Sequence, residues 1–204
     1  DAMLWGDSHG VELAYALALE ARAQGWALVQ RTTSSCPPVL GYDAPRDARC
    51  AAANRAAFAA LRANPAIRRV YLAAFWANGA FDDPAFVAKL DRSIAAIRAE
   101  GREVVLIGAV PPQPFDVPRR LAHLARAGRL AEAQGVARSW LDARTVHLRA
   151  LFARWQAQGV RLIDPAVALC DARHCAIEQG GKPLYFDSHH LSVTGARLVI
   201  ARGG

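Results

Sequence analysis

Three side chains near the two ends of the sequence are of the types that together perform nucleophilic catalysis. Ser8 lies in "MLWGDSHG", residues 3–10, where an apolar run stops at a turn. Asp187 and His190 lie three positions apart in "YFDSHHLSVTG", residues 185–195. A serine hydroxyl becomes a nucleophile when an imidazole removes its proton and a carboxylate orients that imidazole. The three side chains therefore suit acyl transfer through a serine ester, provided that folding brings them together.

Each of these residues also has an ordinary structural interpretation. Serine and aspartate are frequent turn and N-cap residues, so the turn around Ser8 alone indicates no more than the start of a helix. A histidine pair before a helix can cap it or face solvent. His189 is an alternative base, but the spacing from Asp187 favours His190. His9 is left out of the triad, because its side-chain direction does not follow from the sequence.

The elements that must position these side chains alternate between short apolar runs and long amphipathic stretches. Strands are expected at residues 2–6, 27–31, 69–74, 103–109 and 160–164. Helices are expected at residues 11–25, 48–64, 84–101, 119–158 with a break at Gly128, and 192–203. This alternation predicts an α/β fold, a three-layer α/β/α sandwich around a central parallel sheet of about five strands.

The predicted topology places the candidate residues at one edge of the sheet. In such sheets the ligand site lies beyond the carboxyl ends of the strands. Ser8 directly follows the first strand, and the turn from Asp187 to His190 follows the fifth strand and precedes the last helix. The free amides of the helix that begins near Ser8 would stabilise an oxyanion there. The conjunction of the three groups favours the catalytic interpretation over the structural one.

Composition indicates one domain over residues 1–204, since 53 % of the chain is hydrophobic. The apolar run at 104–110 is far shorter than the ~20 residues of a membrane-spanning helix, so no span is expected in this segment. The net charge of +7 comes from arginine, because Lys89 and Lys182 are the only lysines. A basic surface favours acidic partners, but no basic run with interleaved aromatics indicates nucleic acid. The chain opens almost directly on a strand, so we expect a piece of a longer protein.

The four cysteines form two local pairs, Cys36 with Cys50 and Cys170 with Cys175. Each pair brackets a loop, which favours two disulfides in an oxidising compartment. Zinc is the alternative, since His174 lies within "CDARHC". The close Cys-x-x-Cys spacing of structural zinc sites is missing, however. Neither a metal nor another cofactor is therefore expected.

Two separated motifs carry a family resemblance. "GDSH" at 6–9 and "DSHHLS" at 187–192 resemble the SGNH (GDSL-like) hydrolase superfamily, which has a flavodoxin-like fold. More narrowly, these motifs, "SCPP" at 35–38 and "PLYFD" at 183–187 are similar to the SGNH domain joined to bacterial acyltransferase-3 membrane proteins, which O-acetylate surface polysaccharides, O-antigen included. The resemblance covers the chain from Trp5 to Gly195.

The resemblance implies a role for each candidate residue. Ser8 would be the nucleophile and one oxyanion donor, His190 the general base and then acid, and Asp187 its orienting carboxylate. The acetyl donor would come from the acyltransferase-3 membrane part of the same longer chain, with this domain on the periplasmic face of the inner membrane. The acceptor would be a glycan of the O-antigen or lipopolysaccharide kind. The alternatives are a carbohydrate or lipid esterase and a non-catalytic glycan-binding module.

The chain departs from the superfamily pattern at the remaining oxyanion donors, a glycine after the second strand and an asparagine after the third. The segment after the second strand reads "TTSSCPP" and lacks glycine, so a backbone amide near Ser34 is one substitute. After the third strand, Phe75 or Trp76 falls near the expected asparagine, and Asn78 comes slightly late. Asn78 is the predicted donor, with a simple turn residue before Gly79 as the alternative.

Overall fold

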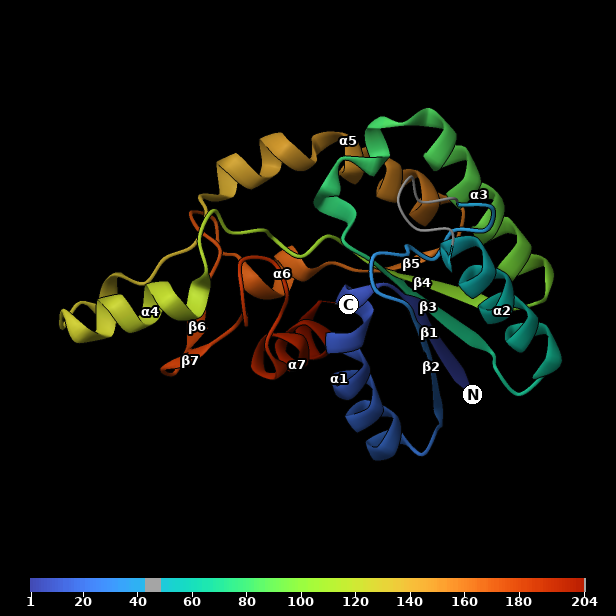
Figure 1. Ribbon diagram of the computed structural model, residues 1–204, viewed down its shortest axis with the longest axis horizontal. Helices are drawn as coiled ribbons and strands as arrows, with labels where there is room; N and C mark the ends of the chain where they lie inside the picture. Colours follow the sequence, from blue (N-terminus) through green and yellow to red (C-terminus); the bar gives the residue numbers. More distant parts are fainter. Residues whose placement is uncertain (43–48, 204) are drawn as a thin grey trace.

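A parallel sheet forms the centre of the computed structural model, which describes residues 1–42 and 49–203. The strands run in the order β2-β1-β3-β4-β5 (Figure 1), and every neighbouring pair is parallel. Their bounds are Ala2–Gly6 (β1), Leu28–Thr32 (β2), Arg69–Ala73 (β3), Glu103–Ile107 (β4) and Arg161–Ile163 (β5). This is the strand order of flavodoxin-like folds, so the predicted fold class is confirmed.

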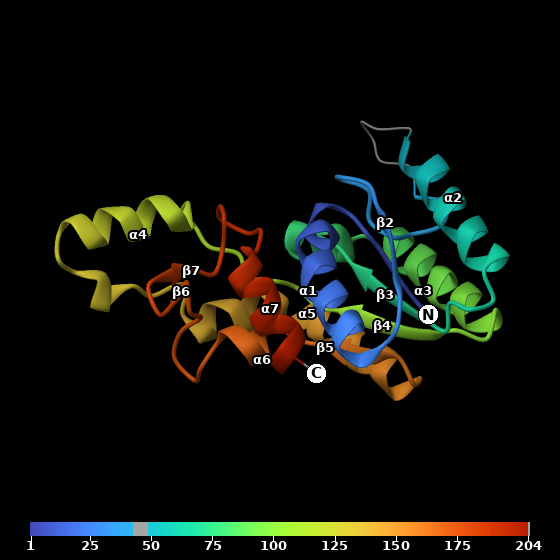
Figure 2. The same cartoon turned by 90° about the horizontal axis from the view of Figure 1, so that it is seen from below.

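Helices cover both faces of the sheet. One face carries Ser8–Gln24 (α1) and Val193–Arg202 (α7), which lie side by side in Figures 1 and 2. The other face carries Arg49–Ala63 (α2), Pro84–Ala99 (α3) and Arg138–Ala157 (α5). The smaller elements of the described residues are Val117–Arg126 (α4), Pro165–Leu169 (α6), the hairpin strands Glu178–Gln179 (β6) and Lys182–Pro183 (β7), and the short 3-10 helices Trp76–Asn78, Ala80–Asp82 and Leu130–Glu132.

The alternation of side chains along the central strand explains the two covered faces. Leu4 of β1 joins the apolar cluster under α1 and α7, whereas Met3 and Trp5 join the cluster under α2, α3 and α5. Successive side chains of a strand point to opposite faces, and all five residues of β1 are buried. A strand buried on both faces reads as a continuous apolar run, which is why the sequence predicted β1 at its observed bounds.

Several boundaries differ from the expected ones. Helix α1 begins at Ser8 rather than at 11, because Asp7 caps it, and the long helical stretch divides into α4, a 3-10 helix and α5. The expected first residue of α2, position 48, lies outside the described residues. Helix α6 and the β6-β7 hairpin were not predicted. The amphipathic pattern of the long helical stretch predicts both Trp140 and Trp155 in the core. Trp155 is buried, but Trp140 of α5 is 39 % exposed.

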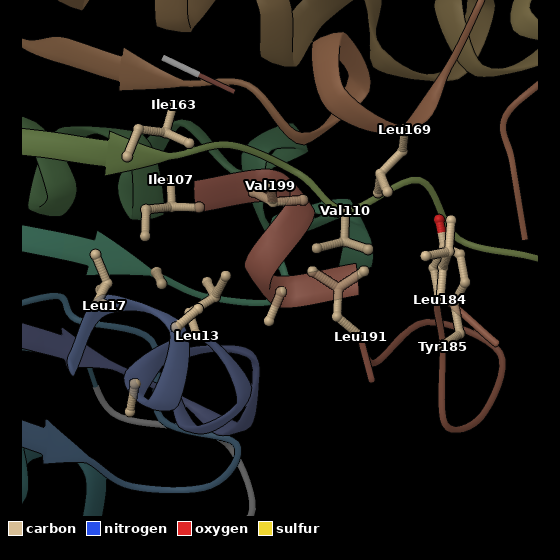
Figure 3. Close-up of a cluster of buried hydrophobic side chains, with 14 of the residues drawn as sticks. Leu13, Leu17, Ile107, Val110, Ile163, Leu169, Leu184, Tyr185, Leu191 and Val199 are labelled. Atoms are coloured by element: carbon tan, nitrogen blue, oxygen red, sulfur yellow. The ribbon is translucent and has the colours of Figure 1, made fainter. Parts of the chain in front are cut away.

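An apolar cluster joins the last part of the chain to the first helix. Figure 3 shows Leu13 and Leu17 of α1 in this cluster with Leu191, Val199 and Tyr185. The phenolic hydroxyl of Tyr185 is buried and donates to the carbonyl of Pro111, which follows β4, at 3.0 Å. The turn between Tyr185 and Leu191 is thus anchored at both of its ends, next to the start of α1.

The cysteines form the two expected disulfides, Cys36 with Cys50 and Cys170 with Cys175. Disulfide sulfurs cannot act as thiolate ligands, so the zinc alternative for these residues is wrong. Among the described helices, none has both the length and the apolar character needed to cross a bilayer.

Candidate active site

Ser8 stands where β1 ends and α1 begins, with a single residue between the preceding strand and the serine. Gly6 closes β1, and a Cβ atom at Gly6 would lie 2.2 Å from the carbonyl oxygen of Ala73, so only glycine fits. The side chain of Asp7 caps α1 by accepting the N–H of His9 at 2.8 Å. Ser8 is therefore the first residue of a helix, where free N–H groups and the helix dipole favour negative charge.

One carboxylate organises the closing turn. Oδ1 of Asp187 accepts the N–H groups of His189 and His190, each at 2.8 Å. The other oxygen, Oδ2, lies 2.7 Å from Nδ1 of His190. Burial alone would raise the pKa of Asp187, but these hydrogen bonds lower it to about 2. The carboxylate is thus ionised at neutral pH and accepts a hydrogen bond from the Nδ1–H group of His190.

The imidazole of His190 reaches from this turn to Ser8. Its Nε2 lies 3.0 Å from the serine Oγ, although the two residues are 182 positions apart. An ionised carboxylate only accepts hydrogen bonds, so Nδ1 of His190 carries the proton and Nε2 accepts the serine hydroxyl. The ring of Phe186 stacks on the imidazole at 5.1 Å. The structure brings together the three side chains that the sequence singled out.

A contact between two further histidines lies beside the hydrogen bond between His190 and Ser8. Sequence reasoning did not predict this contact. His9 is 2 % exposed, and its Nε2 lies 3.1 Å from Nδ1 of His189. Phe75 stacks on both rings, at 4.8 Å and 4.5 Å between centroids. Burial lowers the pKa of His9 to about 3, so this imidazole is neutral at physiological pH. Its partner is 180 positions away, and no local spacing could indicate the contact.

His9, His189 and His190 also form the one group in residues 1–42 and 49–203 whose ligand atoms gather as a metal site would require, within 4.8 Å of one another. A metal-bound imidazole donates its second ring N–H to an acceptor. Nδ1 of His9, however, is buried without a hydrogen-bond partner among the described residues. Nε2 of His190 is in turn bonded to Ser8. The arrangement suits hydrogen-bonded imidazoles better than a metal centre.

A buried acid completes the surroundings of the serine. Glu12 lies one helical turn after Ser8, and its side chain is 10 % exposed. Its Oε2 accepts the N–H of Leu191 at 2.6 Å, and its Oε1 lies 3.8 Å from Nε2 of His190. Burial raises the pKa of Glu12 to about 8. Sequence reasoning missed this residue, although its position four after the serine places both on one helix face.

The loops after β2 and β3 are where the superfamily has its further oxyanion donors. Unlike the serine turn and the closing turn, these loops depart from the superfamily pattern. Asn78 ends the 3-10 helix Trp76–Asn78, and its Oδ1 accepts the N–H of Ala80 at 2.9 Å. After β2, Ser35 has a φ of 62°, the left-handed conformation that favours glycine, and it precedes the disulfide-bonded Cys36. This segment therefore adopts a glycine-like backbone without glycine. The role of Asn78 stays a prediction.

The sequence matches one protein family over residues 1–202, which is described as the SGNH domain fused to AT3 domains. This chain belongs to that family. The match spans both the serine turn and the closing turn, as the resemblance of the two motifs predicted. A comparison with curated protein sequences gives no match.

Solved structures share the fold at low sequence identity. The periplasmic domain of the lipopolysaccharide acetyltransferase of Salmonella ser. Paratyphi A has a TM-score of 0.79 and 19 % identity, over 98 % of this chain and 81 % of that one. The aryl esterase of M. smegmatis has a TM-score of 0.57 and 14 % identity, over 98 % of this chain and 94 % of that one. Membership of the family and the fold support an acyl-transfer chemistry, while substrate and mechanism belong to the proposal below.

Proposed function

We propose that this domain moves an acetyl group, through an ester on Ser8, onto a hydroxyl of a bacterial surface polysaccharide. The hydrogen-bonded series Asp187, His190 and Ser8 carries the proposal, because a serine becomes nucleophilic only beside an oriented base. The family description, which joins this domain to AT3 domains, supports an acetyl-related role.

The first half-reaction forms the acyl-enzyme. Nε2 of His190 takes the proton of the Ser8 hydroxyl as Oγ attacks the acetyl carbonyl, and the imidazolium is stabilised by Asp187. The carbonyl oxygen becomes an oxyanion at the N-terminus of α1, where the Ser8 amide donates to it. Its collapse breaks the bond to the leaving group, which receives the proton from His190. The product is an acetyl ester on Ser8.

The second half-reaction transfers the acetyl group to the acceptor. A sugar hydroxyl gives its proton to Nε2 of His190 and attacks the ester carbonyl. The resulting intermediate collapses with release of the acetylated sugar, and Ser8 recovers its proton from the imidazolium. The side-chain amide of Asn78 is the proposed second oxyanion donor in both halves, since its Oδ1 is already bonded to Ala80 and its amide nitrogen is the donor that remains.

The proposal includes a location and partners. By analogy with the Salmonella periplasmic domain, this chain acts as a single catalytic domain on the periplasmic face of the inner membrane, joined to an AT3 domain that supplies the acetyl donor. The two disulfides fit an oxidising compartment. The acceptor is a glycan of the lipopolysaccharide or O-antigen kind.

The proposal is tested with the purified domain, p-nitrophenyl acetate and an O-deacetylated lipopolysaccharide glycan. Acetylated glycan is expected from the wild-type protein and is lost in Ser8→Ala. The exposed Ser139 offers a control, because Ser139→Ala leaves the helix start at Ser8 intact.

The other two outcomes separate the alternatives. Acetate release that is unaffected by the glycan, and lost in Ser8→Ala, would indicate an esterase. Full glycan acetylation in cells that carry Ser8→Ala in the whole protein would contradict catalysis by this domain and favour a glycan-binding module.

A further inference from the structure

Glu12 shares the helix face of Ser8 but has no role in the three-residue series described above. The two residues are four positions apart on α1, so their side chains are neighbours on the helix surface. The Glu12 side chain is 10 % exposed. Within residues 1–42 and 49–203 no arginine or lysine forms an ion pair with it, which is unusual for a buried carboxyl group. A buried acid next to a reacting hydroxyl calls for a specific reason.

The two oxygens of Glu12 face different groups. Oε2 accepts the N–H of Leu191 at 2.6 Å and so binds α1 to the residue that follows His190. Oε1 lies 3.8 Å from Nε2 of His190. Since Oε2 accepts a hydrogen bond, the proton of the neutral acid sits on Oε1. The free O–H therefore lies on the side of the reacting imidazole nitrogen.

Burial, together with nearby negative charges, keeps this carboxyl neutral. Burial is the main cause of its raised pKa of about 8, and the negative charges of Asp187 and Asp7 add to it. His190 is the titratable base that faces it. The basic Arg197 belongs to the neighbouring helix α7. It lies beside Glu20, which is further along α1 than Glu12. Glu12 is consequently a hydrogen-bond donor at neutral pH and an anion above pH 8.

We infer that Glu12 is a positioning residue that holds the attacking hydroxyl of the acceptor against Nε2 of His190. This inference rests on the proposed function. Once Ser8 carries the acetyl group, the acceptor hydroxyl must donate its one proton to Nε2, at about 2.6–3.2 Å. An oxygen bound there lies within reach of Oε1 as well. Because its proton is committed to Nε2, it has only lone pairs to offer, and its second partner must be a donor.

The ionised form of Glu12 would work against the same step. A carboxylate has no proton to donate, competes with Nε2 for the acceptor proton, and repels the negative charge that develops on the attacking oxygen. Glutamine at this position retains both useful features, because its carbonyl can accept the N–H of Leu191 and its NH₂ group can donate. Unlike glutamate, it does not ionise.

The test measures the second step directly. The domain is acetylated with p-nitrophenyl acetate, and loss of the acetyl group to water and to glycerol, used as a polyol probe, is followed by intact-protein mass spectrometry between pH 6 and 9.5. The wild-type rate is expected to fall above pH 8, while Glu12→Gln keeps its rate. Glu12→Ala is expected to lose acetyl groups about 10- to 100-fold more slowly at pH 7, since the attacking oxygen is misplaced. Glu20→Gln, on the same helix, is the control.

The outcomes separate this inference from the proposed function. Identical pH profiles for the wild type and Glu12→Gln, or an unchanged rate in Glu12→Ala, overturn the role of Glu12. Failure of the wild-type domain to form an acetyl-enzyme overturns the proposed function, and the inference with it. A general loss of structure does not mimic the expected result, because Glu12→Gln restores the rate that Glu12→Ala loses.

Discussion

The sequence contains two turns with the same Asp-x-x-His pattern, "DARH" at 171–174 and "DSHH" at 187–190, and only the second lies at the serine. In each turn, one aspartate oxygen accepts the N–H groups two and three residues later. The distances are 2.6 and 2.7 Å for Asp171 and 2.8 and 2.8 Å for Asp187. In both cases these hydrogen bonds contribute to a lowered pKa of the aspartate.

The turns differ in where the fold places them. The first is enclosed by the Cys170–Cys175 disulfide, and its His174 backbone forms a bridge with Ala137. The second lies beyond the carboxyl edge of the sheet, where the ring of His190 bonds both to the carboxylate and to the serine. The local pattern therefore specifies a turn, while the position at the sheet edge makes a candidate base of its histidine.

The largest effect on activity is expected from removing the negative charge of the aspartate in the second turn. Asp187→Asn keeps the carbonyl that accepts the turn amides but removes the charge that orients and stabilises the imidazolium. We expect kcat/KM for p-nitrophenyl acetate to fall about 10²- to 10⁴-fold. Asp171→Asn, which makes the same change in the first turn, is expected to leave kcat/KM within about twofold. Equal losses in both variants would contradict the assignment.

A smaller effect on activity is expected from removing a hydrogen-bond donor to the oxyanion. Neither of the two aspartate turns supplies such a donor, so the change is made at Asn78. Asn78→Asp keeps the oxygen that accepts the N–H of Ala80 but loses the amide donor. If Asn78 stabilises the oxyanion, kcat falls by roughly 10²-fold. The initial rate of p-nitrophenol release from p-nitrophenyl acetate at saturation measures it. An unchanged kcat would remove Asn78 from the site and favour a backbone amide near Ser34.

The smallest effect on activity is expected from the disulfide around the first turn. Replacing Cys170 and Cys175 by serine opens a loop with a sequence separation of 5, which by chain entropy lowers the free energy of unfolding by about 2 kcal/mol. Opening the Cys36–Cys50 loop, with a separation of 14, is expected to cost about 3 kcal/mol. Urea unfolding measures both. Loss of esterase activity in the folded Cys170/Cys175 variant would show that the first turn matters to the site.

The sequence predicted the sheet well because buried parallel strands are short continuous apolar runs, as β1 and β4 show. It also predicted that Ser8, Asp187 and His190 meet, since strand ends and turns fix where a residue lies relative to the sheet edge. Their catalytic role stays a prediction. The start of α1 was missed because Asp7, a capping residue, lies outside the apolar periodicity that defines the helix.

Contacts between distant residues could not be predicted from spacing. The bond from Leu191 to Glu12 joins positions 179 apart, and the contact between His9 and His189 joins positions 180 apart. Both depend on how α1 packs against the closing turn, which no periodicity encodes. Trp140 was misplaced for a related reason, because helical spacing does not show which end of α5 extends beyond the core.

The most direct test of the account is covalent labelling with a fluorophosphonate probe, which reacts only with an activated serine and is not turned over. The account predicts that one probe molecule attaches to the domain, that peptide mapping locates it on Ser8, and that labelling is lost in Ser8→Ala and slowed in Asp187→Asn but not in Asp171→Asn. Absence of labelling in the wild-type protein, or labelling at a different residue, would contradict the account.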